Sequence, residues 1–234
     1  MAKERTASAL APYLQSTLIA NDITEARIVA HCRACLEYGF HAAMVPGVWV
    51  PTARRLLAGS RVRVASFVDF PLGTMTTAGR VAEIRSLVAA GAQEVDVMVP
   101  LGRFKSGHVD AVREDLRAVV RAARPAETKV MLELPLLDPA ERERMLEIAL
   151  EAGFDWVKNA SGGAVGVATP DDIAWLRRRV PAGVRVKASG GIKTADQAWA
   201  LVDAGAELLG TSAAVAIVTG TGAGAGAARH RTGY

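Results

Sequence analysis

Cysteine is scarce in this sequence, and histidine is only slightly more frequent. The chain of 234 residues has two cysteines, Cys32 and Cys35, and four histidines that lack the spacing of metal ligands. Two thiols with no second pair cannot complete a four-ligand zinc site or build the disulfide framework of a small secreted protein. The helical periodicity around both cysteines predicts ordinary helix residues in a reducing compartment. We therefore expect no metal site.

Long apolar runs and a dominant charge are missing as well. No stretch approaches the roughly 20 apolar residues of a membrane span, and the first residues lack the apolar segment of a signal peptide. The formal charge is +4, and the arginines are spread over helical stretches instead of forming a basic stripe with aromatic residues. These features argue against membrane insertion and nucleic-acid binding. We expect a cytoplasmic protein with neither kind of partner.

Lysine is rare among the basic residues. Only six of the 28 are lysines: Lys3, Lys105, Lys129, Lys158, Lys187 and Lys193. Arginine stays protonated at any workable pH, whereas a lysine that is desolvated, or that lies beside another cation, can lose its proton and become a nucleophilic amine. A lysine within a buried strand of this chain therefore indicates a function that arginine cannot supply.

Short runs rich in Val, Ile, Leu and Ala alternate with longer amphipathic stretches along the chain. This alternation is typical of parallel strands connected by crossover helices, and Asp138, Thr169 and Thr194 are predicted to begin three of the helices. The predicted strands cover residues 13–18, 42–45, 62–68, 94–99, 129–133, 155–158, 184–188 and 207–210. Eight strand–helix units predict a (β/α)8 TIM barrel formed by residues 1–218 as a single domain, with an open doubly wound sheet as the alternative.

Two of the predicted strands end in lysine just before a glycine-rich turn. Lys158 ends one strand in DWVKNASGG, and Lys187 lies at the end of the next strand in VRVKASGG. The carboxyl ends of barrel strands face the active site, so we expect both ammonium groups in one partly desolvated cavity. Each then lowers the pKa of the other, and the more deeply buried amine is expected to lose its proton.

Asp96 is the third candidate for this cavity. It lies between valines in QEVDVMVP. An isolated carboxylate in such a strand would be costly, but one beside a lysine pair is compensated and can transfer protons. The alternative for all three residues is a buried charge network that only specifies the core.

Glycine-rich turns follow the last three predicted strands. ASGG occurs after both lysine strands, and GTSAA begins at the end of the strand 207–210. Backbone N–H groups in such turns, at the N-termini of helices, form a cradle for an anion, and a barrel usually binds phosphate after its seventh and eighth strands. The three turns therefore predict a phosphate-binding part of the cavity.

These residues resemble the deoxyribose-phosphate aldolase family of class I aldolases, from about residue 14 to residue 218. The resemblance is carried by EVDVMV, WVKNASG and VKASGGIKT, together with SFVDFPLGTMTTAGRVAE and LGRFKSG. It implies a (β/α)8 barrel without a cofactor, in which Lys158 forms a Schiff base, Lys187 lowers the pKa of Lys158 and Asp96 relays protons. It also implies a substrate phosphate bound at Gly162, Gly190, Gly191, Gly210 and Ser212. The implied reaction joins acetaldehyde to glyceraldehyde 3-phosphate to give 2-deoxyribose 5-phosphate, or reverses it.

The sequence departs from the family pattern in the first strand and in the phosphate loops. The first strand carries LQST where the family has an aspartate near the substrate, which puts Gln15 and Ser16 there and retains Thr17 as a substrate-binding candidate. The phosphate loops have Lys193 where arginine is common and Ala213 where a second serine is frequent. These departures keep two other functions open: the same lysine chemistry on a different, unphosphorylated aldehyde or ketone, and a catalytically silent barrel that binds a phosphosugar.

The C-terminal segment has a different composition. Residues 219–234, TGTGAGAGAARHRTGY, are rich in Gly, Ala and Thr and are predicted to form a flexible tail. Some members of the family end in a tyrosine that reaches the site and transfers a proton, and this chain ends in Tyr234. We therefore expect a catalytic role for Tyr234. We also expect a homo-oligomer, a dimer or tetramer, that acts on phosphosugar and aldehyde substrates.

Overall fold

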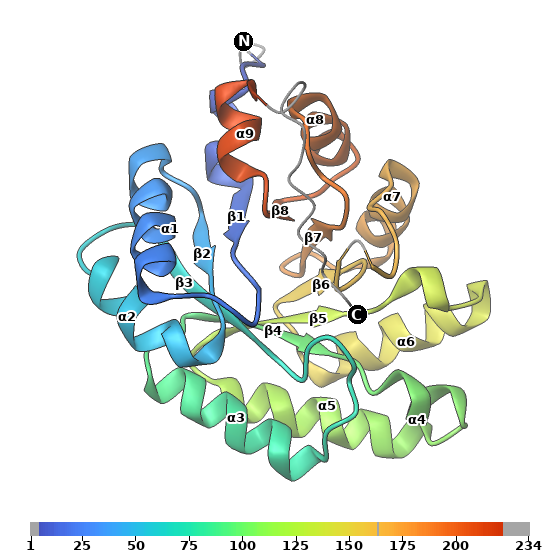
Figure 1. Cartoon of the computed structure of the whole chain (residues 1–234). Coiled ribbons are helices and arrows are strands. Elements are labelled where there is room, and N and C mark those ends of the chain that lie inside the picture. Colours follow the sequence, from blue (N-terminus) through green and yellow to red (C-terminus); the bar gives the residue numbers. More distant parts are fainter. Residues whose placement is uncertain (1–4, 163, 222–234) are drawn as a thin grey trace.

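A computed structural model describes residues 5–162 and 164–221 of the chain. Its strands form one closed parallel barrel in sequence order, and the first strand pairs with both the second and the last (Figure 1). The strands are β1 (Leu14–Thr17), β2 (Ala42–Met44), β3 (Arg63–Val68), β4 (Glu94–Met98), β5 (Glu127–Met131), β6 (Trp156–Lys158), β7 (Arg185–Ser189) and β8 (Leu208–Thr211). This architecture confirms the predicted (β/α)8 barrel and contradicts the open sheet.

Helices surround the barrel and connect successive strands (Figure 1). Three of them begin as the sequence predicts: the side chains of Asp138, Thr169 and Thr194 each accept a hydrogen bond from a backbone N–H in the first helical turn. These bonds satisfy amides that the first turn leaves unpaired. The helices are α1 (Glu25–Tyr38), α2 (Val50–Leu56), α3 (Thr77–Ala89), α4 (Leu101–Lys105), α5 (Val109–Ala123), α6 (Pro139–Ala152), α7 (Pro170–Arg179), α8 (Ala195–Asp203) and α9 (Ala214–Thr219), with 3-10 turns η1 (Ser8–Tyr13), η2 (Gly47–Trp49) and η3 (Leu134–Leu136).

The fifth strand differs from its prediction. It spans Glu127–Met131 rather than residues 129–133, because Glu133 turns out of the sheet with a left-handed φ of 56°. The carboxylate of Glu133 accepts hydrogen bonds from the backbone N–H and the hydroxyl of Ser161, at 2.5 and 3.2 Å. The earlier start puts Lys129 in the middle of β5, opposite Asp96 on β4.

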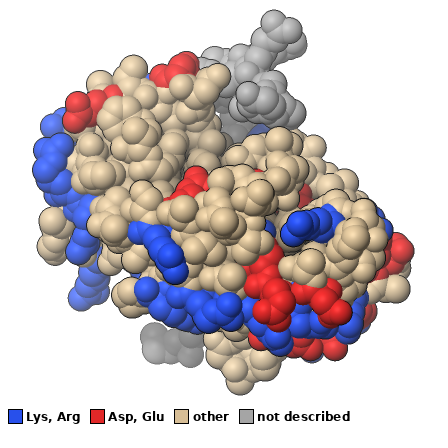
Figure 2. Space-filling view, turned by 90° about the horizontal axis from the view of Figure 1, so that it is seen from below, with Lys and Arg blue, Asp and Glu red and all other residues tan. Residues whose placement is uncertain are grey.

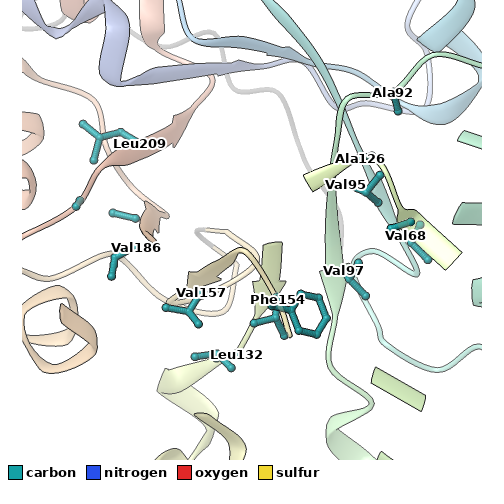
Figure 3. Packing of buried hydrophobic residues seen from close by; sticks show 14 of the residues in the cluster. Val68, Ala92, Val95, Val97, Ala126, Leu132, Phe154, Val157, Val186 and Leu209 are labelled. Carbon is teal, nitrogen blue, oxygen red and sulfur yellow. The ribbon is translucent and has the colours of Figure 1, made fainter. Parts of the chain in front are cut away.

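Side chains alternate between the two faces of each strand. The outward-facing positions are apolar and pack under the helices; Figure 3 shows several of them, including Val95, Val97, Val157, Val186 and Leu209. Valines flank Asp96 on both sides and precede both Lys158 and Lys187 in sequence, so these three charged side chains point into the barrel. Lys158 and Lys187 lie opposite one another in the register of β6 and β7.

The outer surface carries mixed charge. Ion pairs join neighbouring helices, including Lys105 with Glu141 and Arg113 with Glu151. On the face in Figure 2, basic groups lie along the left and lower edges, and acidic groups gather beside basic ones at the lower right. In the part of the chain that the structure describes, no helix combines the length and hydropathy needed to cross a bilayer.

Candidate active site

A cavity of about 260 Å³ opens at the carboxyl ends of the strands. Ten of the residues predicted for the site lie on its wall: Thr17, Asp96, Lys158, Gly162, Lys187, Gly190, Gly191, Lys193, Gly210 and Ser212. The remaining candidate, Tyr234, lies outside the described residues. Residues 5–162 and 164–221 hold no group of three or more His, Cys, Asp or Glu side chains arranged to bind a metal ion. Residues far apart in the sequence thus meet in one cavity.

Asp96 joins the two lysines at the floor of the cavity. Lys158 Nζ donates to Asp96 Oδ2 over 3.2 Å, and Lys187 Nζ donates to the same oxygen over 2.6 Å. The exposed fractions of Lys158, Lys187 and Asp96 are 5%, 1% and 1%. Two amines that share one carboxylate oxygen can exchange a proton through it.

The remaining contacts of the two lysines differ. Lys187 Nζ also donates to Oε1 of Gln15 on β1, so both of its acceptors hold it deep in the barrel. Lys158 Nζ donates to the backbone carbonyl of Ser161, 3.3 Å away, on the turn that leads to Gly162. Lys158 is therefore the amine beside the glycine turns, and Lys187 is the amine held beneath them.

The charge states at the floor follow from burial and from neighbouring charges. Burial lowers the pKa of Lys187 to about 7; Asp96 opposes this shift, and the cations of Lys158 and Lys129 add to it. Burial alone would raise the pKa of Asp96, but Lys187, Lys158 and Lys129 hold the pKa of its carboxyl well below the usual range. At neutral pH Asp96 is ionised, and Lys187 loses its proton more readily than an exposed lysine does. The more deeply buried lysine of the pair, Lys187, is thus an amine that loses its proton.

Glycine is required in the turn after β7. Gly190 and Gly191 have φ values of 111° and 70°, and a Cβ atom on Gly190 would lie 2.4 Å from the carbonyl oxygen of Gly166. The turns after β6 and β7 therefore touch, and a backbone hydrogen bond joins them. Backbone amides near the start of α8, with Lys193 and Ser212 on the same wall, offer donors for an anion.

Apolar side chains form another part of the wall. They include Ile19, Met44, Phe67, Phe70 and Met131. The ring centroids of Phe67 and Phe70 are 5.1 Å apart. An apolar wall limits water and strengthens the electrostatic interactions of the groups it encloses. The cavity thus combines a charged floor, amide-rich turns and an apolar side.

Two buried charged residues beneath the cavity were not predicted from the sequence. Lys129 and Glu94 both point into the barrel, and Lys129 Nζ lies 2.5 Å from Glu94 Oε2. The sequence held a signal for each of them, since Lys129 is one of only six lysines and Glu94 shares the strand parity of Asp96. The predicted strand began at residue 129, which put Lys129 at the amino-terminal end of the strand. A charged side chain there can reach solvent and needs no buried partner.

Known proteins match this chain along nearly its whole length, although no family model matches it. A deoxyribose-phosphate aldolase from a Geobacillus species is 40% identical over 210 residues, covering 89% of this chain and 94% of the relative. One from Brevibacillus brevis is 41% identical over 207 residues, covering 88% and 94%. The chain belongs to the deoxyribose-phosphate aldolase family. The tetrameric deoxyribose phosphate aldolase of Aeropyrum pernix superposes with a TM-score of 0.85 at 30% identity, with 94% of each chain covered. Family membership confirms the resemblance drawn from the motifs.

The first strand of this aldolase differs from the expectation for Gln15 and Ser16. The Gln15 side chain lies beneath the cavity, between Lys187 and Glu94, and does not line the wall. Ser16 faces outward toward Cys35 on α1, because side chains alternate along a strand. Of these three positions only Thr17 lines the cavity. The amide of Gln15 thus contacts Lys187 and Glu94 beneath the cavity.

Proposed function

We propose that this aldolase cleaves and forms 2-deoxyribose 5-phosphate, with acetaldehyde and glyceraldehyde 3-phosphate as the other substrates. Support comes from the names of its relatives. It also comes from one feature of the site: Lys158 and Lys187 contact the same oxygen of Asp96 in a cavity with an apolar wall. An amine, a proton acceptor and an ionised carboxylate in contact are the set that imine chemistry needs.

Lys158 is the proposed nucleophile. Its neutral amine attacks the aldehyde carbon of the sugar, water leaves, and the protonated imine becomes an electron sink. The bond between carbons 2 and 3 then breaks, its electron pair passes to the enamine, and the hydroxyl proton on carbon 3 leaves toward the Asp96–Lys187 pair. Lys187 fits the role of proton acceptor for Lys158, because its pKa is lowered to about 7 and both amines contact one Asp96 oxygen.

The sugar phosphate is proposed to bind at the glycine turns, beside Lys193 and Ser212. Deoxyribose 5-phosphate should therefore be preferred to deoxyribose by about tenfold or more in kcat/KM, because each charge-assisted hydrogen bond contributes about 1.5–3 kcal/mol. Lys193→Met should raise KM for the phosphorylated sugar more than for deoxyribose. Lys105→Met, the same change on the outer surface, is the matched control.

Other results of this comparison would favour other functions. Equal kcat/KM on both sugars would contradict the phosphate site and favour an unphosphorylated aldehyde or ketone as the substrate. Saturable binding of the phosphosugar by calorimetry without any turnover would contradict the aldolase reaction and favour a silent binding barrel.

The proposal extends to Tyr234, which lies outside the described residues. Its phenol would transfer a proton to or from the enamine carbon. Tyr234→Phe should then slow turnover by roughly ten- to a thousandfold, while imine formation at Lys158 stays intact because that step does not need the phenol. Unchanged turnover in Tyr234→Phe would remove Tyr234 from the mechanism.

We further propose a cytoplasmic homo-oligomer, a dimer or tetramer. Support for assembly comes from the Aeropyrum pernix relative, which is described as tetrameric. Light scattering on the purified full chain should give a mass of at least two chains at micromolar concentration. A monomer at that concentration would contradict this proposal and leave the proposed reaction untouched.

A further inference from the structure

A second layer of buried charge lies directly beneath the lysine pair. The side chains of Lys129 on β5 and Glu94 on β4 are both 0% exposed, and their charged atoms lie 2.5 Å apart. Lys129 Nζ is also 3.5 Å from Asp96 Oδ1, whereas Lys158 and Lys187 both bond to Oδ2. The carboxylate of Asp96 is therefore held between three ammonium groups, two at one oxygen and one at the other.

Glu94 connects this layer to the amino end of the barrel. Its Oε1 lies 2.7 Å from His41 Nε2 and 3.1 Å from Arg63 Nε, and its Oε2 accepts a hydrogen bond from Gln15. Burial alone would raise the pKa of Glu94, but Lys129 and His41 hold the pKa of its carboxyl well below the usual range. Glu94 is thus an ionised partner that balances Lys129 from below.

The charges inside the barrel do not cancel. Three lysines, at positions 129, 158 and 187, form ion pairs with two carboxylates, Glu94 and Asp96, and excess positive charge in a buried site is relieved by loss of a proton. Lys158 also lies near the buried carboxylate of Glu133, whereas Lys187 is the more deeply buried of the two lysines that contact Asp96 Oδ2. The other polar or charged groups that face the layer, strand by strand, are Gln15, His41, Arg63, Glu127, Trp156 and Arg185, and Glu133 acts on Lys158 from the end of β5.

We propose that Lys129 is a positioning residue of this aldolase: as a third buried ammonium group it holds the carboxylate of Asp96 from below and, by repulsion, favours loss of the proton from Lys187. Lys129 does not line the cavity, so it acts on the reaction through these two residues. The inference stands on the contacts of Lys129 and depends on the proposed function only for its effect on turnover.

Replacing Lys129 by a neutral side chain of similar length tests the repulsion directly. In Lys129→Met one cation beside Lys187 is gone, so the protonated form of Lys187 becomes more stable and its titration midpoint should rise by about one pH unit. Lys105→Met makes the same change on the outer surface, where the Lys105 side chain is 41% exposed. That control should leave the midpoint of Lys187 where it is.

The small number of lysines makes this midpoint measurable by NMR. With six lysines in the chain, protein labelled with ¹³C and ¹⁵N only in lysine gives few Cε signals, and single substitutions assign them. The signal that disappears in Lys187→Met should titrate at about pH 7 in the native protein. An unchanged midpoint of that signal in folded Lys129→Met would overturn the inference.

A second variant keeps the test decisive if Lys129→Met does not fold because Glu94 is left buried without its partner. The double variant Glu94→Gln with Lys129→Met is compared with Glu94→Gln alone, so that the two proteins differ only in the cation of Lys129, and the midpoint of Lys187 should be higher in the double variant. Equal midpoints in these two variants would equally overturn the inference. The acid side of the kcat/KM profile for deoxyribose 5-phosphate should move with the midpoint. If the native protein does not act on this sugar, the proposed function fails, while the NMR midpoint still decides the role of Lys129.

Discussion

The interior of the barrel is divided into two unlike halves. On the side of β2 and β3 the inward residues Ala42, Met44 and Ala65 form a small apolar cluster against Phe67. On the side of β4 to β7 the buried inward residues include five that carry charge: Glu94, Asp96, Lys129, Lys158 and Lys187. The cluster itself carries no charge, and the charged groups of this side, His41 and Arg63, contact Glu94 at the amino end of the barrel. At the level of the cluster the charges of the other half therefore act on one another at low dielectric. The reactivity of the lysines thus depends on a wall that takes no part in the chemistry.

The largest expected effect comes from removing the central anion of the charged half. Asp96→Asn keeps the shape of the side chain but removes the charge that both cavity lysines contact, so kcat/KM should fall by about 10²–10⁴-fold. Met44→Leu, a volume-conserving change in the apolar half, should cost less than about 1.5 kcal/mol of stability and far less activity. Steady-state kinetics and urea unfolding of both variants measure the contrast. Equal losses of activity would mean that the two halves do not differ in function.

One added methyl group sharpens the comparison at the edge of the charged half. A Cβ on Gly210 would lie 2.8 Å from Ser189 Oγ and 3.0 Å from Lys187 Cε. Gly210→Ala should therefore displace Lys187 from Asp96 and lower kcat by about ten- to a hundredfold. Gly153, with φ of 86° at the end of α6, has no heavy atom near its Cβ position. Gly153→Ala should cost about 1 kcal/mol of stability and leave kcat unchanged, and a similar loss of kcat in both would contradict the displacement.

The last effect is small per pH unit: a dependence of stability on pH. The pKa of Lys187 is lowered to about 7 in the folded barrel, and it returns to about 10.4 in the unfolded chain. Below the lower value both states carry the proton. Between the two values the unfolded chain binds more protons, so the free energy of unfolding should rise with pH, by at most about 1.4 kcal/mol per unit from this group.

Lys187→Met isolates this contribution. Urea unfolding at several pH values above neutral gives the difference in unfolding free energy between the native protein and Lys187→Met. This difference should rise with pH, by at most about 1.4 kcal/mol per unit. A difference that stays constant with pH would show that Lys187 keeps its proton in the folded barrel, and that the apolar half does not act on it as described.

The barrel and the lysine pair could be predicted from the sequence because both depend on local patterns. Apolar runs alternating with amphipathic stretches define the strand order, and N-cap residues such as Asp138 define helix starts. Lys158 and Lys187 occupy the same place relative to their glycine turns, and strand alternation is enough to send both inward. When the strands close into a barrel, the residues at their carboxyl ends and in the following turns come together around one cavity.

The layer beneath the cavity was not predicted, because the sequence marks its residues only weakly and their contacts depend on register and on distant segments. Lys129 meets Asp96 only because β5 begins at Glu127 and pairs these two positions. Glu133 reads as a strand residue in the sequence but adopts a left-handed φ to reach Ser161. The depth of Lys187 depends on Gln15, which lies 172 residues away along the chain.

The central claim is that Lys158 forms the imine while Lys187, whose pKa burial lowers to about 7, accepts its proton. Borohydride reduction in the presence of acetaldehyde, followed by mass mapping of peptides, tests this directly because it fixes the carbon atoms to the amine that attacked them. We predict a two-carbon adduct on Lys158 in the native protein and in Lys105→Met, and no adduct in Lys158→Arg. An adduct found mainly on Lys187 would contradict the account.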